Sequence, residues 1–231
     1  MRNVNVVRDI VTAVVSDLVD AMLASDNQEF HVALTGGRAG GLIAREFLSR
    51  PEVVANPRLH IWWSDERFVP RENQDRNDLV LAGIEIKGRI HRIAGPDTSE
   101  SIEQSALSYS SELHQFTTTR FCATNTLMDV TILSIGIDGH VASLFPHSAQ
   151  LDSPLGILAI TDSPKPPSQR VTWTFPTINA SDQVWLIATG AEKKDAVRDV
   201  IAGAGLHDIP AAGAVGKKET RLYIDPQASS L

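Results

Sequence analysis

Residues 31–50, HVALTGGRAGGLIAREFLSR, decide the fold. The apolar run from His31 to Thr35 predicts a strand that ends at Gly36-Gly37. The segment from Leu42 to Leu48 has the apolar spacing of a helix, which must stop before Pro51. Strand, glycine turn and helix in this order form half of a βαβ unit.

The same alternation continues through the rest of the sequence. The apolar spacing from Val4 to Met22 predicts a first helix, which packs on a sheet. Further helices are expected at 75–81, 99–116 and 191–202, and further strands at 58–63, within 84–98, and at 129–135, 156–161, 170–175, 182–189 and 220–224. Alternating strands and helices predict an α/β fold, with a mostly parallel sheet covered by helices on both faces. We expect one domain over residues 1–231.

Composition and charge exclude several classes of protein. Hydrophobic residues make up 42% and charged residues 21%, as in globular chains rather than disordered ones. The net charge of −7 predicts no general affinity for nucleic acid or for anionic membranes. A single cysteine, Cys122, excludes an intramolecular disulfide and a cysteine-based zinc site. No stretch resembles a signal peptide or a membrane span, so we expect a cytoplasmic protein.

Polar and glycine-rich clusters follow the predicted strands. In parallel α/β sheets, ligands bind beyond the carboxyl ends of the strands, where helix N-termini point. The sequence therefore predicts a functional site at this edge of the sheet. The clusters expected there are Thr35-Gly36-Gly37, Asp65-Glu66-Arg67, Gly136–His140 and Gly190–Lys193.

The glycine turn after the first βαβ strand is a candidate anion site. Gly36 and Gly37 allow the backbone to approach a phosphate, and Thr35 and Arg38 flank them. The turn is neither a G-x-G-x-x-G fingerprint nor a Walker A loop. A simple tight turn between strand and helix is the alternative interpretation.

The turn Gly136-Ile137-Asp138-Gly139-His140 carries the strongest catalytic signal. Histidine titrates near neutral pH and suits general-base catalysis, and a neighbouring carboxylate such as Asp138 can orient it. The alternative is a turn aspartate followed by a histidine at a helix start. His140 and His147 lack a third ligand at sensible spacing, so no metal site is expected here.

Several cations near the expected site could hold an anion. Lys165 and Arg170 lie on a proline-rich loop, 164–170, and Lys193 begins a helix after Gly190. Asp65 and Arg67 follow an apolar strand and could face a substrate. A surface loop and a solvated strand end are the respective alternatives.

Taken together, these motifs resemble the 6-phosphogluconolactonase family, within the larger group that includes the glucosamine-6-phosphate deaminases. The sequence SLFP after His140 favours the lactonases. The matching segments are LTGGRAG (34–40), WWSDERFVP (62–70), MDVTILSIGIDGHVASLFP (128–146), PKPPSQRVTWTFPTIN (164–179) and ATGAEKKDAV (188–197). Two positions depart from the family pattern: Arg38 begins a stretch where Ser-Thr-Pro is usual, and Arg76 stands where a serine is usual.

The resemblance implies a Rossmann-like fold of the type shared with ribose-5-phosphate isomerases and CoA transferases. It also implies hydrolysis of 6-phospho-D-glucono-1,5-lactone, a small phosphorylated sugar lactone, without metal or cofactor. His140 would activate water, and Asp138 or Asp65 would orient His140 or the sugar hydroxyls. Arg67 or turn N–H groups would stabilise the oxyanion. The phosphate would bind Thr35, Gly36 and Gly37, with Arg38, Lys165, Arg170 and Lys193 supplying positive charge.

Two other functions stay open at this point. One is a sugar-phosphate isomerase-deaminase that uses the same histidine and aspartate. The other is a sugar-phosphate-binding protein without catalysis. The sequence leaves the oligomeric state, monomer or dimer, undecided.

Overall fold

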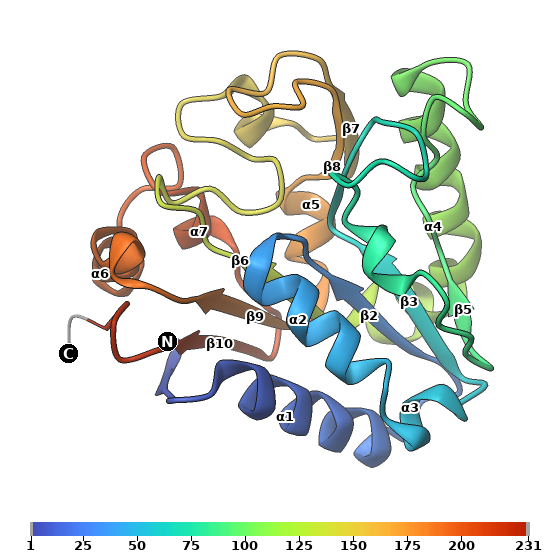
Figure 1. The fold of residues 1–231 in the computed structure, drawn as a ribbon, viewed down its shortest axis with the longest axis horizontal. Helices are drawn as coiled ribbons and strands as arrows, with labels where there is room; N and C mark the ends of the chain where they lie inside the picture. The colour runs from blue at the N-terminus through green and yellow to red at the C-terminus, as the bar shows by residue number, and fades with distance from the viewer. Residues whose placement is uncertain (1, 230–231) are drawn as a thin grey trace.

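A parallel sheet of seven strands forms the centre of the molecule (Figure 1). The computed structural model describes residues 2–229. Its strand order is β1-β10-β9-β6-β2-β3-β5. In chain order the strands are β1 (Asn3–Val6), β2 (Phe30–Leu34), β3 (Leu59–Trp63), β5 (Arg89–Ile90), β6 (Met128–Ser134), β9 (Ser181–Ala188) and β10 (Glu219–Ile224). Every residue of β2 and β3 is buried, as expected for parallel strands covered on both faces.

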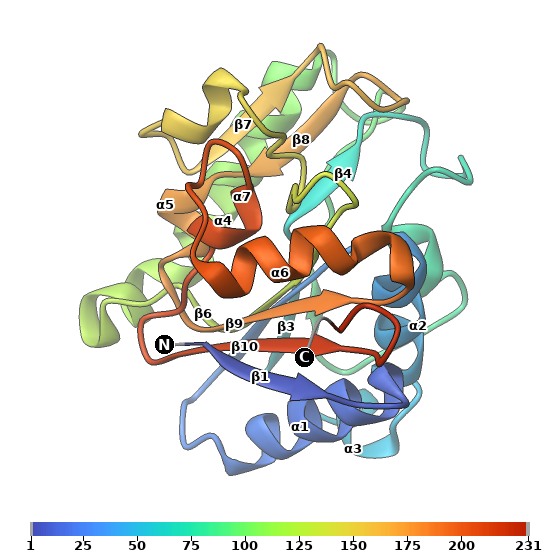
Figure 2. The same cartoon turned by 90° about the vertical axis from the view of Figure 1, so that its left-hand side faces the viewer.

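Helices cover both faces of this sheet, with α1 on one side and α6 on the other (Figure 2). Among residues 2–229, none of the helices is long and apolar enough to cross a membrane. The α-helices are α1 (Ile10–Ala24), α2 (Gly37–Phe47), α3 (Pro51–Val54), α4 (Ile102–Thr124), α5 (Phe175–Ile178), α6 (Lys194–Ala202) and α7 (Pro210–Gly213). Short 3-10 turns are η1 (Asp78–Leu81), η2 (Ala149–Asp152) and η3 (Ala191–Lys193). The prediction of an α/β fold with a mostly parallel sheet is confirmed.

A smaller antiparallel sheet lies on the α6 side of the main sheet (Figure 2). Its order is β4-β8-β7, with β4 (Asp65–Arg67), β8 (Arg170–Trp173) and β7 (Ile157–Ile160). The sequence predicts β7 and β8 but not β4, which is a short and strongly polar strand. Pairing of Arg67 with Arg170 joins the Asp-Glu-Arg segment to the end of the proline-rich loop.

The N-terminal helix differs from its prediction. Val4 lies in β1, which pairs in parallel with β10, and α1 begins only at Ile10. The Asp9 side chain caps this helix by accepting a hydrogen bond from the Thr12 N–H at 3.0 Å. A strand that pairs with a segment far away in the sequence has little local pattern of its own. The prediction of a helix from Val4 is therefore wrong, because the valine spacing continues from β1 into α1.

Two other helices are longer than predicted. α2 begins at Gly37 rather than Leu42, so the glycine-rich turn is its first turn. At Gly40 an added Cβ would overlap the Thr35 carbonyl, so packing requires glycine there despite its poor helix propensity. α4 continues to Thr124 and ends at Asn125, which is left-handed with φ 57°.

A buried group of charges holds the segment that follows β4. Glu66 is fully buried and accepts hydrogen bonds from the N–H groups of Asn77 at 2.7 Å and Asp78 at 2.9 Å. The buried Arg76 guanidinium lies 2.8 Å from Asp78 and 3.6 Å from Glu66. Arg76 is therefore a structural cation, which accounts for its departure from the family pattern.

We expect Arg76→Met to lower the free energy of unfolding by about 3–5 kcal/mol, because it removes the cation that faces the buried carboxylates of Glu66 and Asp78. Urea unfolding measures this change. The matched control is Arg71→Met, at an exposed arginine, which should stay within about 0.5 kcal/mol of the parent. An Arg76→Met variant as stable as the control would contradict this role.

Candidate functional site

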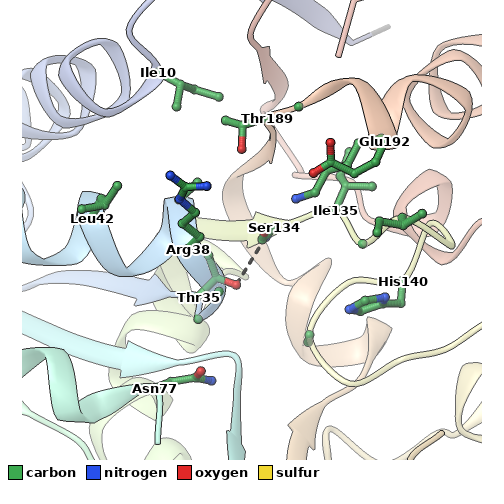
Figure 3. Close-up of a pocket in the computed structure, with 18 of the residues that line it drawn as sticks. Ile10, Thr35, Arg38, Leu42, Asn77, Ser134, Ile135, His140, Thr189 and Glu192 are labelled. Carbon is green, nitrogen blue, oxygen red and sulfur yellow. Dashed lines mark hydrogen bonds between the residues drawn. The ribbon is translucent and has the colours of Figure 1, made fainter. Parts of the chain in front are cut away.

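A cavity of about 630 Å³ opens at the carboxyl edge of the main sheet (Figure 3). Residues following β2, β3, β6 and β9 line it together. The predicted site residues in its wall are Thr35, Gly36, Gly37, Arg38, Asp65, Arg67, His140, Lys165, Arg170 and Lys193. Asp138 lies just behind this wall, in contact with His140.

The turn after β6 holds His140 at the cavity. The Gly136 N–H donates to the His140 carbonyl at 2.8 Å, and the Gly139 N–H donates to the Gly136 carbonyl at 3.0 Å. Gly139 has φ +81°, a conformation that favours glycine. A Cβ added at Gly136 would overlap the His140 imidazole, so this glycine makes the room in which the ring lies.

His140 and Asp138 form a hydrogen-bonded pair through His140 Nδ1 and Asp138 Oδ1. An ionised carboxylate only accepts, so Nδ1 carries the proton and Nε2 has the free lone pair. Within residues 2–229 no hydrogen bond reaches Nε2. The structure thus brings Asp138, and not Asp65, to the imidazole.

Lys165 completes this group. Its ammonium lies 2.9 Å from Asp138 Oδ2 and 3.2 Å from His140 Nδ1. Burial alone would raise the pKa of Asp138, but hydrogen bonds from His140 and Lys165, together with their charges, lower it below its ordinary value. Asp138 therefore stays ionised, and Lys165 pairs with this carboxylate while also lining the cavity.

Phe145 covers one face of the His140 ring, with centroids 4.7 Å apart. The same phenyl ring lies 5.5 Å from the Lys165 ammonium. Phe145 is buried and restricts how far the imidazole can rotate. The sequence predicts no role for Phe145 by itself, although its position five residues after His140 in the SLFP segment is a signal that could indicate one.

Arg170 is a buried cation that holds the loop beside the cavity. Its side chain is 5% exposed. It donates to the carbonyls of Pro167 at 3.0 Å, Lys165 at 3.1 Å and Pro166 at 3.2 Å. Burial lowers the pKa of its guanidinium, and Asp65 lies 3.9 Å away. These donors hold the proline-rich loop that carries Lys165, and Arg170 also lines the cavity, so its phosphate contact stays a prediction.

Asp65 and Arg67 lie on β4 at the cavity wall. Asp65 accepts a 2.6 Å hydrogen bond from Ser143 Oγ and one from Asn77 Nδ2. Arg67 donates to the Asp75 carbonyl, and it also lines the cavity. Ser143 and Asn77 could not be assigned from sequence alone, because only the fold brings them to Asp65.

The Thr35–Gly37 segment forms the opposite wall. Thr35 Oγ1 accepts a 3.3 Å hydrogen bond from the Ser134 N–H, which joins the ends of β2 and β6 (Figure 3). Gly36 is the N-cap of α2 and provides no capping side chain, so the first N–H groups of this helix have no side-chain acceptor there. An added Cβ at Gly36 would overlap Asn77.

Two cations at the cavity have no partner among residues 2–229. Arg38 is exposed and lies across the cavity from His140 (Figure 3). Lys193 is partly buried, and this burial lowers its pKa despite the nearby carboxylates of Glu192 and Asp225. Neither side chain makes a hydrogen bond or ion pair with another described residue, so both are available to an anion.

Solved structures share this architecture. A 6-phosphogluconolactonase from Trypanosoma cruzi superposes with a TM-score of 0.84 at 20% identity, covering 99% of this chain and 96% of that one. The Thermotoga maritima 6-phosphogluconolactonase gives 0.83 at 24% identity, covering 97% and 100%. At these identities the likeness establishes the fold.

Sequence comparison establishes the family. A 6-phosphogluconolactonase of Mycobacterium tuberculosis is 35% identical over 92% of this chain and 88% of its own length. One from Streptomyces coelicolor is 34% identical over 94% and 86%. The sequence profile of the glucosamine-6-phosphate isomerases/6-phosphogluconolactonase family matches residues 3–224. With its fold and most of its length shared, the chain belongs to this family.

Proposed function

We propose that this chain hydrolyses 6-phospho-D-glucono-1,5-lactone to 6-phospho-D-gluconate in the oxidative pentose phosphate pathway, with His140 as the general base. One observation carries the proposal. An imidazole held by a carboxylate presents a free Nε2 at a cavity that also holds the unpaired cations Arg38 and Lys193. The similar 6-phosphogluconolactonases support the same activity.

The reaction proceeds by addition and elimination at the lactone carbonyl. His140 Nε2 takes a proton from water while the water oxygen forms a bond to the carbonyl carbon. The resulting imidazolium is stabilised by the Asp138 carboxylate, which the lowered pKa of that group keeps ionised. The imidazolium then protonates the ring oxygen as its bond to the carbonyl carbon breaks, which restores the neutral base.

The oxyanion forms where donors already line the cavity. The Arg67 guanidinium and backbone N–H groups of the Gly136–His140 turn are the candidates. One well-placed donor contributes about 3–4 kcal/mol to transition-state stabilisation.

The phosphate binds at the N-terminus of α2. Helix N–H groups and the helix dipole favour an anion there. Arg38 and Lys193 supply unpaired positive charge, and Lys165 and Arg170 add charge from the same cavity wall. A cavity of about 630 Å³ is of the size that holds small-molecule ligands.

We expect His140→Ala to lower kcat by roughly 10²–10⁴-fold with KM nearly unchanged, because only proton transfer is lost. Lactone hydrolysis at controlled pH, corrected for the spontaneous reaction, measures this. His147→Ala, at an exposed histidine, is the control and should keep full activity. Equal kcat in both variants would remove the base assignment.

The wild-type protein also tests the two other functions. Ammonia release from glucosamine 6-phosphate would favour the deaminase. Tight binding of 6-phosphogluconate without any turnover of the lactone would favour the non-catalytic protein.

We expect Gly136→Ala to lower kcat at least tenfold, because the added methyl group displaces the His140 ring. Gly41→Ala is the matched control, since a Cβ there meets nothing within 4 Å. Steady-state kinetics and a thermal unfolding curve of each variant separate lost positioning from lost folding. A folded Gly136→Ala enzyme with unchanged kcat would contradict the geometry described for the turn.

We expect Arg38→Ala to raise KM for the phosphorylated lactone about tenfold and to leave kcat nearly unchanged, as for uniform loss of binding. With the unphosphorylated glucono-1,5-lactone the variant should match the wild type. Arg45→Ala, at an exposed arginine on the same helix, is the control. The same loss with both lactones would show that Arg38 does not contact the phosphate.

A further inference from the structure

A stack of buried histidines lies at the amino ends of β2 and β3, the end of the sheet away from the cavity. His31 and His60 are directly paired in the register of these strands and are 0% and 2% exposed. Their rings stack with centroids 4.5 Å apart. Glu29, which precedes β2, has a side chain that is half exposed and contacts both rings.

Hydrogen bonds fix the protons on one side of this stack. Glu112 on α4 accepts from His91 Nδ1 at 2.7 Å, so His91 Nε2 is an acceptor when this imidazole is neutral. His60 Nδ1 lies 3.0 Å from His91 Nε2 and must donate to it. The lone pair of His60 therefore lies on Nε2, which faces Glu29 Oε1 at 3.4 Å.

Two hydrogen-bond acceptors, His60 Nε2 and Glu29 Oε1, thus face each other with no proton between them. This is an unfavourable contact unless a cation joins them. For His60 the arrangement also matches a metal-binding histidine, whose second nitrogen usually donates to an outer acceptor that fixes the tautomer. Here that outer acceptor is His91, held in turn by Glu112.

We propose that His31, His60 and Glu29 form a binding site for a divalent transition metal of the Zn²⁺ class. The donor atoms are Nε2 of both rings and the Glu29 carboxylate, and they lie within 4.8 Å of one another. His31 Nε2 is 3.3 Å and His60 Nε2 is 3.4 Å from a Glu29 oxygen. Bonds of about 2.0–2.1 Å in a tetrahedral zinc site place neighbouring ligands about 3.3 Å apart. Imidazole and carboxylate are ligands that zinc accepts, and water completes the site on the exposed Glu29 side.

The surrounding charges can accommodate a cation. The carboxylates of Glu112 and Asp129 face the stack, together with the guanidinium groups of Arg89 and Arg120, which act on His60 and His31. Arg120 is already paired with Asp129 at 3.0 Å. Arg89 makes no ion pair with another described residue, and the Glu29 carboxylate is the main negative charge left for the metal.

Metal binding has a specific signature at Trp62. The Trp62 Nε1–H now donates to His31 Nδ1 at 3.1 Å, which places the proton of neutral His31 on Nε2. When a metal binds Nε2, the ring proton moves to Nδ1, and Trp62 loses its acceptor. Binding therefore changes the environment of a buried indole that lies outside the coordination shell.

The test is a titration of the full chain with Zn²⁺ by calorimetry, followed by ¹H–¹⁵N spectra of the tryptophan indoles. We expect one saturable site per chain and a shift of the Trp62 indole resonance on binding. Glu29→Gln should weaken binding at least tenfold while leaving lactone hydrolysis unchanged. His60→Gln should weaken it similarly, and the exposed position of Glu29 keeps the test valid if His60→Gln fails to fold.

Matched variants exclude other sites. Glu52→Gln, at an exposed glutamate, and His147→Gln should bind Zn²⁺ as the wild type does. His140→Ala should also retain the affinity, which separates this site from the cavity. The proposal is overturned if the wild type shows no saturable binding, if Glu29→Gln binds equally well, or if the Trp62 resonance stays unshifted at saturation.

Discussion

The hydrogen bond between His140 Nδ1 and Asp138 is the interaction on which the candidate site depends. It selects the tautomer, and so it decides that the nitrogen facing the cavity is the one able to accept a proton. Every neighbouring feature supports this bond. Gly136 leaves room for the ring, Phe145 covers its face, and Lys165 keeps the carboxylate ionised.

Both sheets contribute side chains to the candidate site. The main sheet supplies the strand ends that carry Thr35 and His140, whereas the small antiparallel sheet positions Asp65 and the loop with Lys165. Arg170 connects the proline-rich loop to β4, because its guanidinium donates to the loop carbonyls and lies near Asp65. Arginine suits this position since its fixed fork of donors can serve several acceptors at once.

The sequence predicts the fold class and the edge of the sheet at which the polar clusters meet, because apolar strands and glycine turns are local signals. Prediction from the sequence fails where contacts with distant segments of the chain determine the local structure. Val4 belongs to a strand whose partner is β10, and the helical start at Gly37 depends on packing against Thr35. Arg170 and Lys165 show the same limit, because the sequence gives their charge but not the loop carbonyls and the Asp138 carboxylate that the fold brings to them. No sequence motif predicts that Asn77 and Ser143 donate hydrogen bonds to Asp65.

The pairing of β1 with β10 has a consequence for biosynthesis. Asn3 pairs with Arg221, 218 residues later in the chain, so β1 is synthesised long before the strand beside which it lies in the sheet. The centre of the sheet, formed by β2, β3 and β6, is complete much earlier in translation. During synthesis β1 is therefore an unpaired strand on a nascent chain, the kind of segment that chaperones protect from aggregation.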